Sequence, residues 1–312
     1  MRDRNRPTVS VVIPTHHRAT MLQRAIRSVL AQTYGDFEVI VVDDGPSPEA
    51  EAVVGDCADP RVRYRRHDRN RGAAAARNTG LRECRGVYIG FLDDDDEWLP
   101  EKLERQVDRF QTAEGHVGLV YAGSLKVSDR SETVISVSRP APLREGYVDF
   151  LRSTRFGTSV PLIRTECFDD VGIFDETLPG TQDRDMWIRL ARRFSFDFVP
   201  DILVRHHIHG DQITADLKRK VEARERILEK YRPDLEAHPD VMANFLWKLG
   251  MLCCADGRHK KGRRFIRQAV RIKPHLTGAY RDLIQSMLAP AAYERRLRNE
   301  VFRGADGVPF YY

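Results

Sequence analysis

The chain has 312 residues, 41% hydrophobic and 31% charged, which suits one large α/β domain plus a smaller lobe and excludes a chain that is disordered overall. Its net charge of +5 is unevenly placed: residues 1–211 carry 30 Lys and Arg against 34 Asp and Glu, a net −4, whereas residues 212–312 carry 21 against 12, a net +9. A basic C-terminal third suits an anionic partner, such as a membrane surface, an anionic acceptor or nucleic acid, and equally a solvated helical surface.

The five cysteines, Cys57, Cys84, Cys167, Cys253 and Cys254, are odd in number and include no CxxC pair, which argues against a disulfide framework and a zinc site. The N-terminal residues MRDRNRP lack the apolar core of a signal peptide, and no stretch reaches the ~18 apolar residues of a membrane span. We therefore expect a cytoplasmic protein that meets a membrane, if at all, peripherally at its inner face.

Strands and helices are expected to alternate along the first third of the chain. Apolar, β-branched runs predict strands at residues 8–13 (ending at Pro14), 37–42, 62–65 and 88–92. Helical spacing and helix-start residues predict helices at residues 20–31, 47–55, 73–81 and 100–114. This alternation predicts an α/β fold with a mostly parallel sheet sandwiched by helices. Residues 117–211 continue the alternation, and the rest is expected to be helical.

Polar residues follow three of the expected strands: Pro14-Thr15, Asp43-Asp44 and the run Asp93-Asp94-Asp95-Asp96. Sheets of this type bind ligands beyond the carboxyl ends of their strands. If the three strands are neighbours, their polar ends form one crevice.

The aspartate run predicts a metal site. Four adjacent carboxylates repel one another unless cations screen them, and an ordinary acidic run is simply solvated. This run instead directly follows the apolar segment 88–92. Mg²⁺ and Mn²⁺ prefer carboxylate oxygens and typically take one or two together with substrate phosphates.

The motifs of the main rival classes are absent. The sequence has no GxGxxG after the first strand, no P-loop lysine motif and no GxSxG. These absences argue against dinucleotide-binding proteins, P-loop NTPases and serine hydrolases.

Four blocks, VSVVIPTHHR, AIRSVLAQTYGDFEVIVVDDG, RGAAAARNTGL and GFLDDDDEWLP, resemble in order and spacing the family 2 glycosyltransferases of GT-A fold over roughly residues 8–110. A fifth block, GIFDETLPGTQDRDMWIRL at 172–190, resembles the family's acceptor-side segment. The resemblance covers about two thirds of the chain and ends near residue 214. It implies an inverting, metal-dependent transfer of a sugar from a nucleotide donor (UDP-, GDP- or dTDP-sugar) to a glycan, lipid-linked or small-molecule acceptor, with no nucleic-acid partner.

The resemblance implies a Mn²⁺ or Mg²⁺ site on the aspartate run. Asp93 and Asp95 match the family's D-x-D pair, with Asp95 as the main ligand and Asp93 or Asp94 reaching the donor ribose or the waters of the metal. His209, in VRHHIHGDQIT, is in register with the family histidine that completes the metal site.

The resemblance also implies donor contacts. Asp43, with Asp44 beside it, matches the residue that hydrogen-bonds the nucleobase, and Pro14 and Thr15 match the loop that packs on the nucleoside. Arg77 offers its guanidinium either to the nucleotide or to a buried pair with one of the aspartates.

The catalytic base implied by the resemblance is Asp183, which would take the proton of the acceptor hydroxyl. Many family members have Glu-Asp where this chain has Gln182-Asp183, so one negative neighbour is lost. Asp185 is expected to be a structural partner at the helix start, and Trp187 a core residue.

We expect the catalytic domain at residues 1–214 and a helical lobe at 215–312, with one tetratricopeptide-like helix pair. The segment 259–266 mixes basic and apolar residues, as a peripheral helix on an anionic membrane would, or as a solvated helix face would. Two alternatives to sugar transfer remain open at this point: a nucleotidyltransferase, and an inactive nucleotide-sugar-binding module that acts through its basic lobe.

Overall fold

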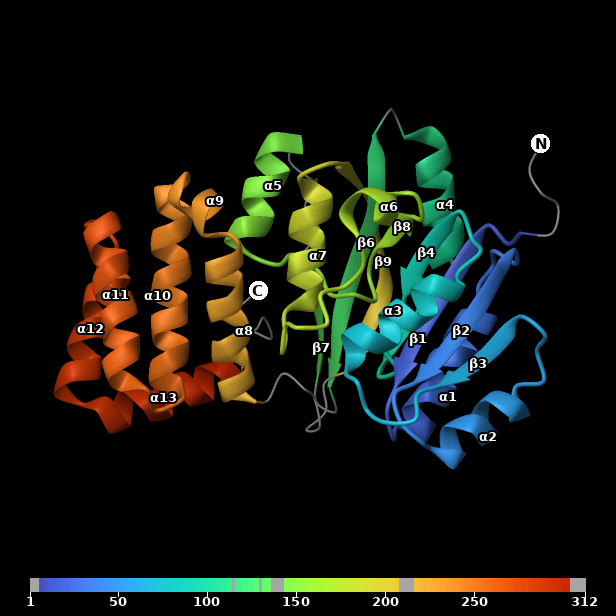
Figure 1. Cartoon of the computed structure of the whole chain (residues 1–312), viewed down its shortest axis with the longest axis horizontal. Coiled ribbons are helices and arrows are strands. Elements are labelled where there is room, and N and C mark those ends of the chain that lie inside the picture. The colour runs from blue at the N-terminus through green and yellow to red at the C-terminus, as the bar shows by residue number, and fades with distance from the viewer. Residues whose placement is uncertain (1–5, 114–115, 129–130, 136–142, 208–215, 304–312) are drawn as a thin grey trace. The chain divides into compact units, whose positions relative to one another are not determined.

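The structure, a computed structural model, describes residues 6–113, 116–128, 131–135, 143–207 and 216–303. The chain divides into two compact units (Figure 1). The first comprises Met1–Gly146, Phe156–Glu176 and Met186–Ile208, and the second Tyr147–Arg155, Thr177–Asp185 and His209–Tyr312. Two short inner segments thus cluster with the C-terminal helices, while the expected boundary near residue 214 stays a prediction.

The first unit is built on a mixed sheet whose order is β3-β2-β1-β4-β8-β6-β9-β5, with β7 paired to β6. Its strands are β1 (Val9–Thr15), β2 (Phe37–Asp43), β3 (Val62–Arg66), β4 (Tyr88–Phe91), β5 (Asp96–Trp98), β6 (Val117–Ser128), β7 (Ser131–Ile135), β8 (Leu162–Arg164) and β9 (Ser195–His207). Strands β3, β2, β1 and β4 run parallel, as do β6 and β9, whereas β8, β7 and β5 pair antiparallel with their neighbours. The predicted α/β class with a mostly parallel sheet is confirmed.

Strands β1 and β2 are buried along their whole length, which explains why their sequences are mostly apolar. Two buried polar residues pair with each other: the Ser10 hydroxyl of β1 donates to Glu38 Oε1 of β2 at 2.7 Å. Strand β1 passes through Pro14 and ends at Thr15, so the expected end at Pro14 was wrong. Pairing with β4 stops at Val12, and the missing N–H of Pro14 therefore removes no hydrogen bond on that side.

Helices of the first unit pack against the sheet (Figure 1). They are α1 (Ala19–Leu30), α2 (Pro48–Asp56), α3 (Ala73–Glu83), α4 (Lys102–Thr112) and α6 (Cys167–Val171). Helix α1 buries Leu22, Ala25, Ile26 and Val29, the 3.6-residue spacing that its sequence predicts. Helix α3 is rich in alanine because it lies very close to β1: a Cβ at Gly80 would meet Val12 Cγ2 at 3.0 Å.

Helices α5 (Leu143–Arg152) and α7 (Gln182–Ala191) belong partly to each unit. The second unit continues with α8 (Leu217–Lys230), α9 (Arg232–Glu236), α10 (Pro239–Ala255), α11 (His259–Ile272), α12 (Thr277–Leu288) and α13 (Pro290–Arg303). Helix α10 is its core, buried at twelve positions. It meets α11 at two glycines, where a Cβ on Gly250 would lie 2.7 Å from Gly262 O. Within the described part of the chain, no helix is long and apolar enough to cross a membrane.

Candidate active site

The polar ends of β1, β2 and β4 meet, as expected, because β1 pairs with both other strands. Thr15, the last residue of β1, donates its hydroxyl to Asp94 Oδ2 at 2.7 Å, 79 residues further along the chain. In register, Thr15 lies beside Asp43 at the end of β2. One edge of the sheet therefore brings these three predicted residues together.

Asp43 is fully buried. Its Oδ2 accepts a hydrogen bond of 2.7 Å from the Tyr64 hydroxyl. Burial raises its pKa despite this bond and the nearby N–H of Ser47. Its Oδ1 is buried and accepts no hydrogen bond of normal geometry from a described residue, so Asp43 has room for one further donor.

Asp44 holds the loop that leads into α3. Its carboxylate accepts hydrogen bonds from the backbone N–H groups of Arg71 (2.8 Å) and Gly72 (2.6 Å). His67 Nδ1 lies 2.8 Å from the same carboxylate, and His67 Nε2 lies 2.8 Å from Thr79 Oγ1. Gly72 adopts a φ of 93°, a conformation that favours glycine. Asp44 is thus buried and anchors the loop before α3. Its predicted contact with the nucleotide-sugar donor stays a prediction.

Asp93 is held by three side chains. Arg77 Nη2 lies 2.5 Å from its Oδ1, the Thr158 hydroxyl donates to its Oδ2 at 2.8 Å, and its backbone N–H donates to Ser159 Oγ at 3.1 Å. Burial by itself would raise the pKa of Asp93, but the Arg77 charge and the hydrogen bonds from Arg77 and Thr158 lower it below its ordinary value. The buried pair of Arg77 with an aspartate is therefore observed, and its contact with the nucleotide stays a prediction.

Asp94 and Asp95 share one guanidinium. Arg18 Nη1 lies 3.2 Å from Asp94 Oδ1 and 3.2 Å from Asp95 Oδ2. Burial raises the pKa of Asp94 to about 6, against the opposing effects of Thr15 and Arg18. The Asp95 side chain is 15% exposed, twice as much as that of Asp94 at 7%.

Asp96 starts β5, where it lies opposite His206 of β9. His206 Nδ1 lies 2.8 Å from Asp96 Oδ2, and the Ser159 hydroxyl donates to the same oxygen at 2.5 Å. Burial is the largest single influence and lowers the pKa of His206, but the charge and hydrogen bond of Asp96 together with the charge of Asp93 raise it by more, so the net shift is upward. His209, the predicted metal ligand, lies outside the described residues.

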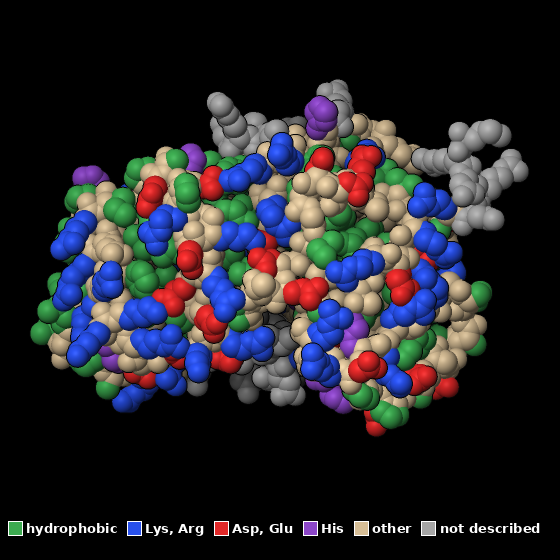
Figure 2. All heavy atoms as spheres, viewed as in Figure 1, with side chains coloured by type: hydrophobic (Ala, Val, Ile, Leu, Met, Phe, Trp, Pro, Cys, Tyr) green, Lys and Arg blue, Asp and Glu red, His purple; other side chains and the backbone are tan. Residues whose placement is uncertain are grey.

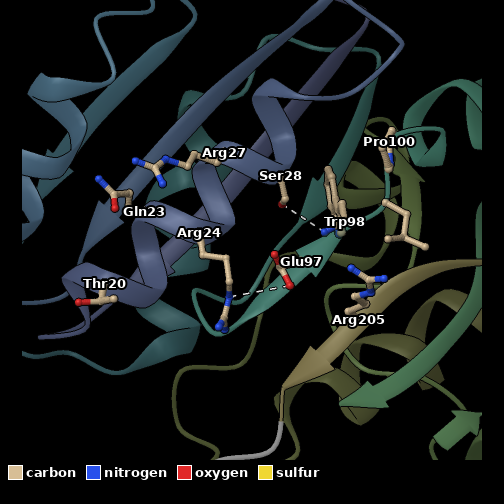
Figure 3. Close-up of a pocket in the computed structure, with 10 residues that line it drawn as sticks. Thr20, Gln23, Arg24, Arg27, Ser28, Glu97, Trp98, Pro100 and Arg205 are labelled. Atoms are coloured by element: carbon tan, nitrogen blue, oxygen red, sulfur yellow. Dashed lines mark hydrogen bonds and ion pairs between the residues drawn. The ribbon is translucent and has the colours of Figure 1, made fainter. Parts of the chain in front are cut away.

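A groove of about 600 Å³ lies beside the aspartate run, between α1 and the β5–β9 pair (Figure 3). Arg24 of α1 borders it, lies 4.0 Å from Glu97 and donates to the backbone oxygen of Asp95 at 2.7 Å. Ser28, one turn further along α1, accepts a 3.1 Å bond from the backbone N–H of Trp98. Helix α1 therefore fixes the backbone at Asp95 and again at Trp98, the last residue of β5.

Asp183 is the second residue of α7 and is partly exposed. The preceding Thr181 has a φ of 57°, unusual for a residue with a side chain, and Gln182 Nε2 donates to Leu178 O at 2.9 Å. Asp185 is fully buried, and its Oδ1 lies 2.7 Å from both the Tyr231 hydroxyl and Lys230 Nζ. Asp185 thus has the structural role expected for it.

The residues present fit a divalent cation held by few protein ligands. Among the described residues, no three His, Cys, Asp or Glu side chains form a ready-made metal cluster. A Mg²⁺ or Mn²⁺ ion that also binds substrate phosphates needs only one or two carboxylates, and Asp95 and Asp93 supply hard oxygen donors. The arginine already bridging Asp94 and Asp95 shows that this point attracts a positive charge.

Sequence reasoning missed Arg18, Thr158, Ser159 and His206 as partners of the aspartates. No local pattern singles out Thr158 and Ser159, which reach Asp93 and Asp96 from more than 60 residues away. Only Arg18 could have been suspected from the sequence, because it closely follows the end of the first strand.

Comparison with known proteins supports this description. The model of glycosyl transferase family 2 matches residues 10–160. An uncharacterized glycosyltransferase of Rickettsia prowazekii is 30% identical over 248 residues, which cover 78% of this chain and 73% of the relative. The chain belongs to glycosyl transferase family 2, as the sequence blocks predicted. It spans about a third of the length of some other relatives, for example 30% of an uncharacterized glycosyltransferase of Rickettsia bellii.

Solved structures share the fold. Staphylococcus aureus TarS 1–349 in complex with UDP-GlcNAc has a TM-score of 0.66 at 17% identity, over 95% of this chain and 92% of that one. The mannosyltransferase PcManGT of Pyrobaculum calidifontis, in complex with GDP-Man and Mn²⁺, has a TM-score of 0.58 at 19% identity, over 95% and 87%. At these identities the likeness shows the fold alone, and it agrees with the predicted GT-A type.

Proposed function

We propose that this chain catalyses an inverting, metal-dependent transfer of a sugar from a nucleoside diphosphate donor to an acceptor hydroxyl. The observation that carries the proposal is the meeting of Asp43, Thr15 and the aspartate run at the carboxyl ends of three neighbouring strands. Ligands of such sheets bind at this edge. Family membership and the donors bound by two proteins of the same fold, UDP-GlcNAc and GDP-Man, support it.

Asp43 is the proposed nucleobase contact. Its buried Oδ1 lacks a hydrogen bond of normal geometry, and leaving a buried acceptor unmatched costs about 1–3 kcal/mol. A nucleobase N–H would relieve that cost. Pro14 and Thr15, in the adjoining strand end, would pack against the nucleoside, and Asp44 would support the site by holding the loop before α3.

Asp95 and Asp93 are the proposed holders of Mn²⁺ or Mg²⁺, with His209 as a further predicted ligand. When bound, the metal would neutralise the charge that develops on the departing diphosphate. Arg77 acts through Asp93, which it orients and keeps ionised. Asp94 would stay with Thr15 and Arg18 and shape the floor of the site.

Asp183 is the proposed general base. It lies in the first turn of α7, where the helix dipole favours an ionised carboxylate. As the acceptor oxygen bonds to the anomeric carbon and the bond to the diphosphate breaks, the hydroxyl proton would pass to Asp183. The Gln182 amide donates to the backbone oxygen of Leu178 at 2.9 Å.

The test uses a panel of UDP-, GDP- and dTDP-sugars, with Mn²⁺ or with EDTA, and with glycan, lipid-linked and small-molecule acceptors. For an active pair we expect EDTA to abolish transfer and proton NMR of the product to show an inverted anomeric centre. Asp183→Asn should lower kcat about 10²–10⁴-fold. Asp95→Ala should remove several kcal/mol of charge stabilisation, at least about 10²-fold in rate.

Asp68→Asn, an exposed carboxylate change, is the matched control and should keep full activity. Transfer that persists in EDTA would refute the metal claim, and near-wild-type activity of Asp183→Asn would refute the base. If no donor is turned over while calorimetry still detects nucleotide-sugar binding, the chain is a binding module. Release of pyrophosphate from a nucleoside triphosphate would point to a nucleotidyltransferase.

A further inference from the structure

Helix α11 presents a stripe of cations to solvent. Its fourteen residues, HKKGRRFIRQAVRI, include six Lys and Arg and no acidic residue. Lys260, Arg264, Arg267 and Arg271 follow one another at spacings of four, three and four, so they lie on one helix face. All four are exposed, and none forms an ion pair with a described residue.

Two cations that neighbour the stripe are paired, which sets the stripe apart from them. Lys261 lies 2.5 Å from Glu225, and Lys273 lies 2.6 Å from Asp240. Unpaired cations gathered on one face repel one another. A surface that keeps them together without acidic partners is suited to an anionic partner.

Helix α12 presents a stripe of apolar side chains. Tyr280, Ile284, Met287 and Leu288 are 41%, 54%, 56% and 81% exposed. Their spacing places them on one face, and the opposite face buries Ala279, Asp282 and Ser286. Single exposed apolar residues are ordinary, but several on one helix face mark an interaction surface.

The two stripes lie on helices that pack directly against each other. Arg263 of α11 donates to Ser286 O of α12 at 2.9 Å, and Ile272 at the end of α11 is itself 39% exposed. Each stripe lies opposite the buried face of its own helix. Figure 2 shows many Lys and Arg side chains over these C-terminal helices, with hydrophobic side chains at the edge beside them.

We propose that the α11 and α12 stripes together form a docking surface for an anionic lipid bilayer. Cations beside an exposed apolar face are what an interfacial helix uses: the cations attract the anionic headgroups, and the apolar side chains enter the headgroup boundary. A nucleic acid would leave the apolar stripe without a partner. Docking on a bilayer would determine where the protein acts, and it does not depend on the proposed sugar transfer.

The test is flotation of the full chain with phosphatidylcholine vesicles that contain or lack phosphatidylglycerol. We expect binding only to the anionic vesicles, weakened by salt. Each cation near an anionic surface is worth about fivefold in affinity, so Arg264→Gln with Arg267→Gln should weaken binding about 25-fold. Met287→Ser with Leu288→Ser should remove the part of the binding that survives high salt.

The matched control is Arg226→Gln with Arg232→Gln, which removes the same charge from two ion-paired residues of this unit. The control should bind like the wild type, and circular dichroism should show that every variant is folded. Equal losses in the control and in the Arg264–Arg267 pair, or no flotation of the wild type, would overturn the proposal. A dimer that light scattering detects and that Leu288→Ser dissociates would also overturn the proposal, because the apolar stripe would then join two copies of the chain.

Discussion

Asp94 makes the stability of the protein depend on pH in a defined direction. Burial raises its pKa from 3.8 to about 6, and its side chain is only 7% exposed, so solvent screens the effect little. Between these values the folded protein keeps a proton that the unfolded chain has lost, so the free energy of unfolding falls as the pH rises through this window. At about 1.4 kcal/mol per pKa unit, ionised Asp94 costs about 3 kcal/mol above about pH 6.

Asp94→Asn removes this charge and keeps the shape of the side chain. We expect the variant to gain up to about 3 kcal/mol in free energy of unfolding at about pH 7.5, and about 0.5 kcal/mol at about pH 4, where the folded wild type is itself protonated. Urea unfolding in EDTA measures both, with the exposed Asp68→Asn as control. A variant that is less stable than the wild type at both pH values, or whose gain grows toward low pH, would refute the reasoning.

Three further substitutions test the packing around the site and the lobe. Tyr64→Phe removes the hydroxyl that holds Asp43, so the pKa of Asp43 should rise further and unfolding in urea should become easier by about 1–3 kcal/mol. Gly262→Ala would bring a Cβ to 2.6 Å from Gly250 O, and thermal unfolding should show a loss of about 1–3 kcal/mol. Trp187→Ala empties a fully buried site and should cost about 3–5 kcal/mol in urea unfolding; a loss below 1 kcal/mol in any of the three would contradict the packing described.

The part of the fold that can be predicted is the part that short sequence patterns specify. Strands β1, β2 and β4 are short, mostly apolar and buried, and each ends in or is closely followed by polar residues that mark the proposed binding edge. Their neighbourhood follows from parallel pairing, so the meeting of Thr15, Asp43 and the aspartate run could be anticipated. The core position of Trp187 followed from its apolar helix neighbours in the same way.

The unpredicted part depends on contacts between distant residues. Strand β5 is only three residues long and contains Asp96 and Glu97, so its sequence does not look like a strand; antiparallel pairing with β9 creates it. That same pairing brings His206 to Asp96. Thr158 reaches Asp93 from a segment whose sequence carries no sign of the site.

The contacts of the four aspartates distinguish their environments, which the sequence alone does not. Asp93 is fixed by Arg77 and Thr158, and Asp96 is tied to a serine and a histidine of neighbouring segments. Asp94 is the more deeply buried member of the pair that shares Arg18, and burial disfavours its ionised form. Asp95 is the more exposed member. It lies 3.2 Å from Arg18, whose own side chain is partly exposed. Because a cation that also binds substrate phosphates needs a carboxylate that it can reach, we propose Asp95 as the main metal ligand, with Asp93 in support.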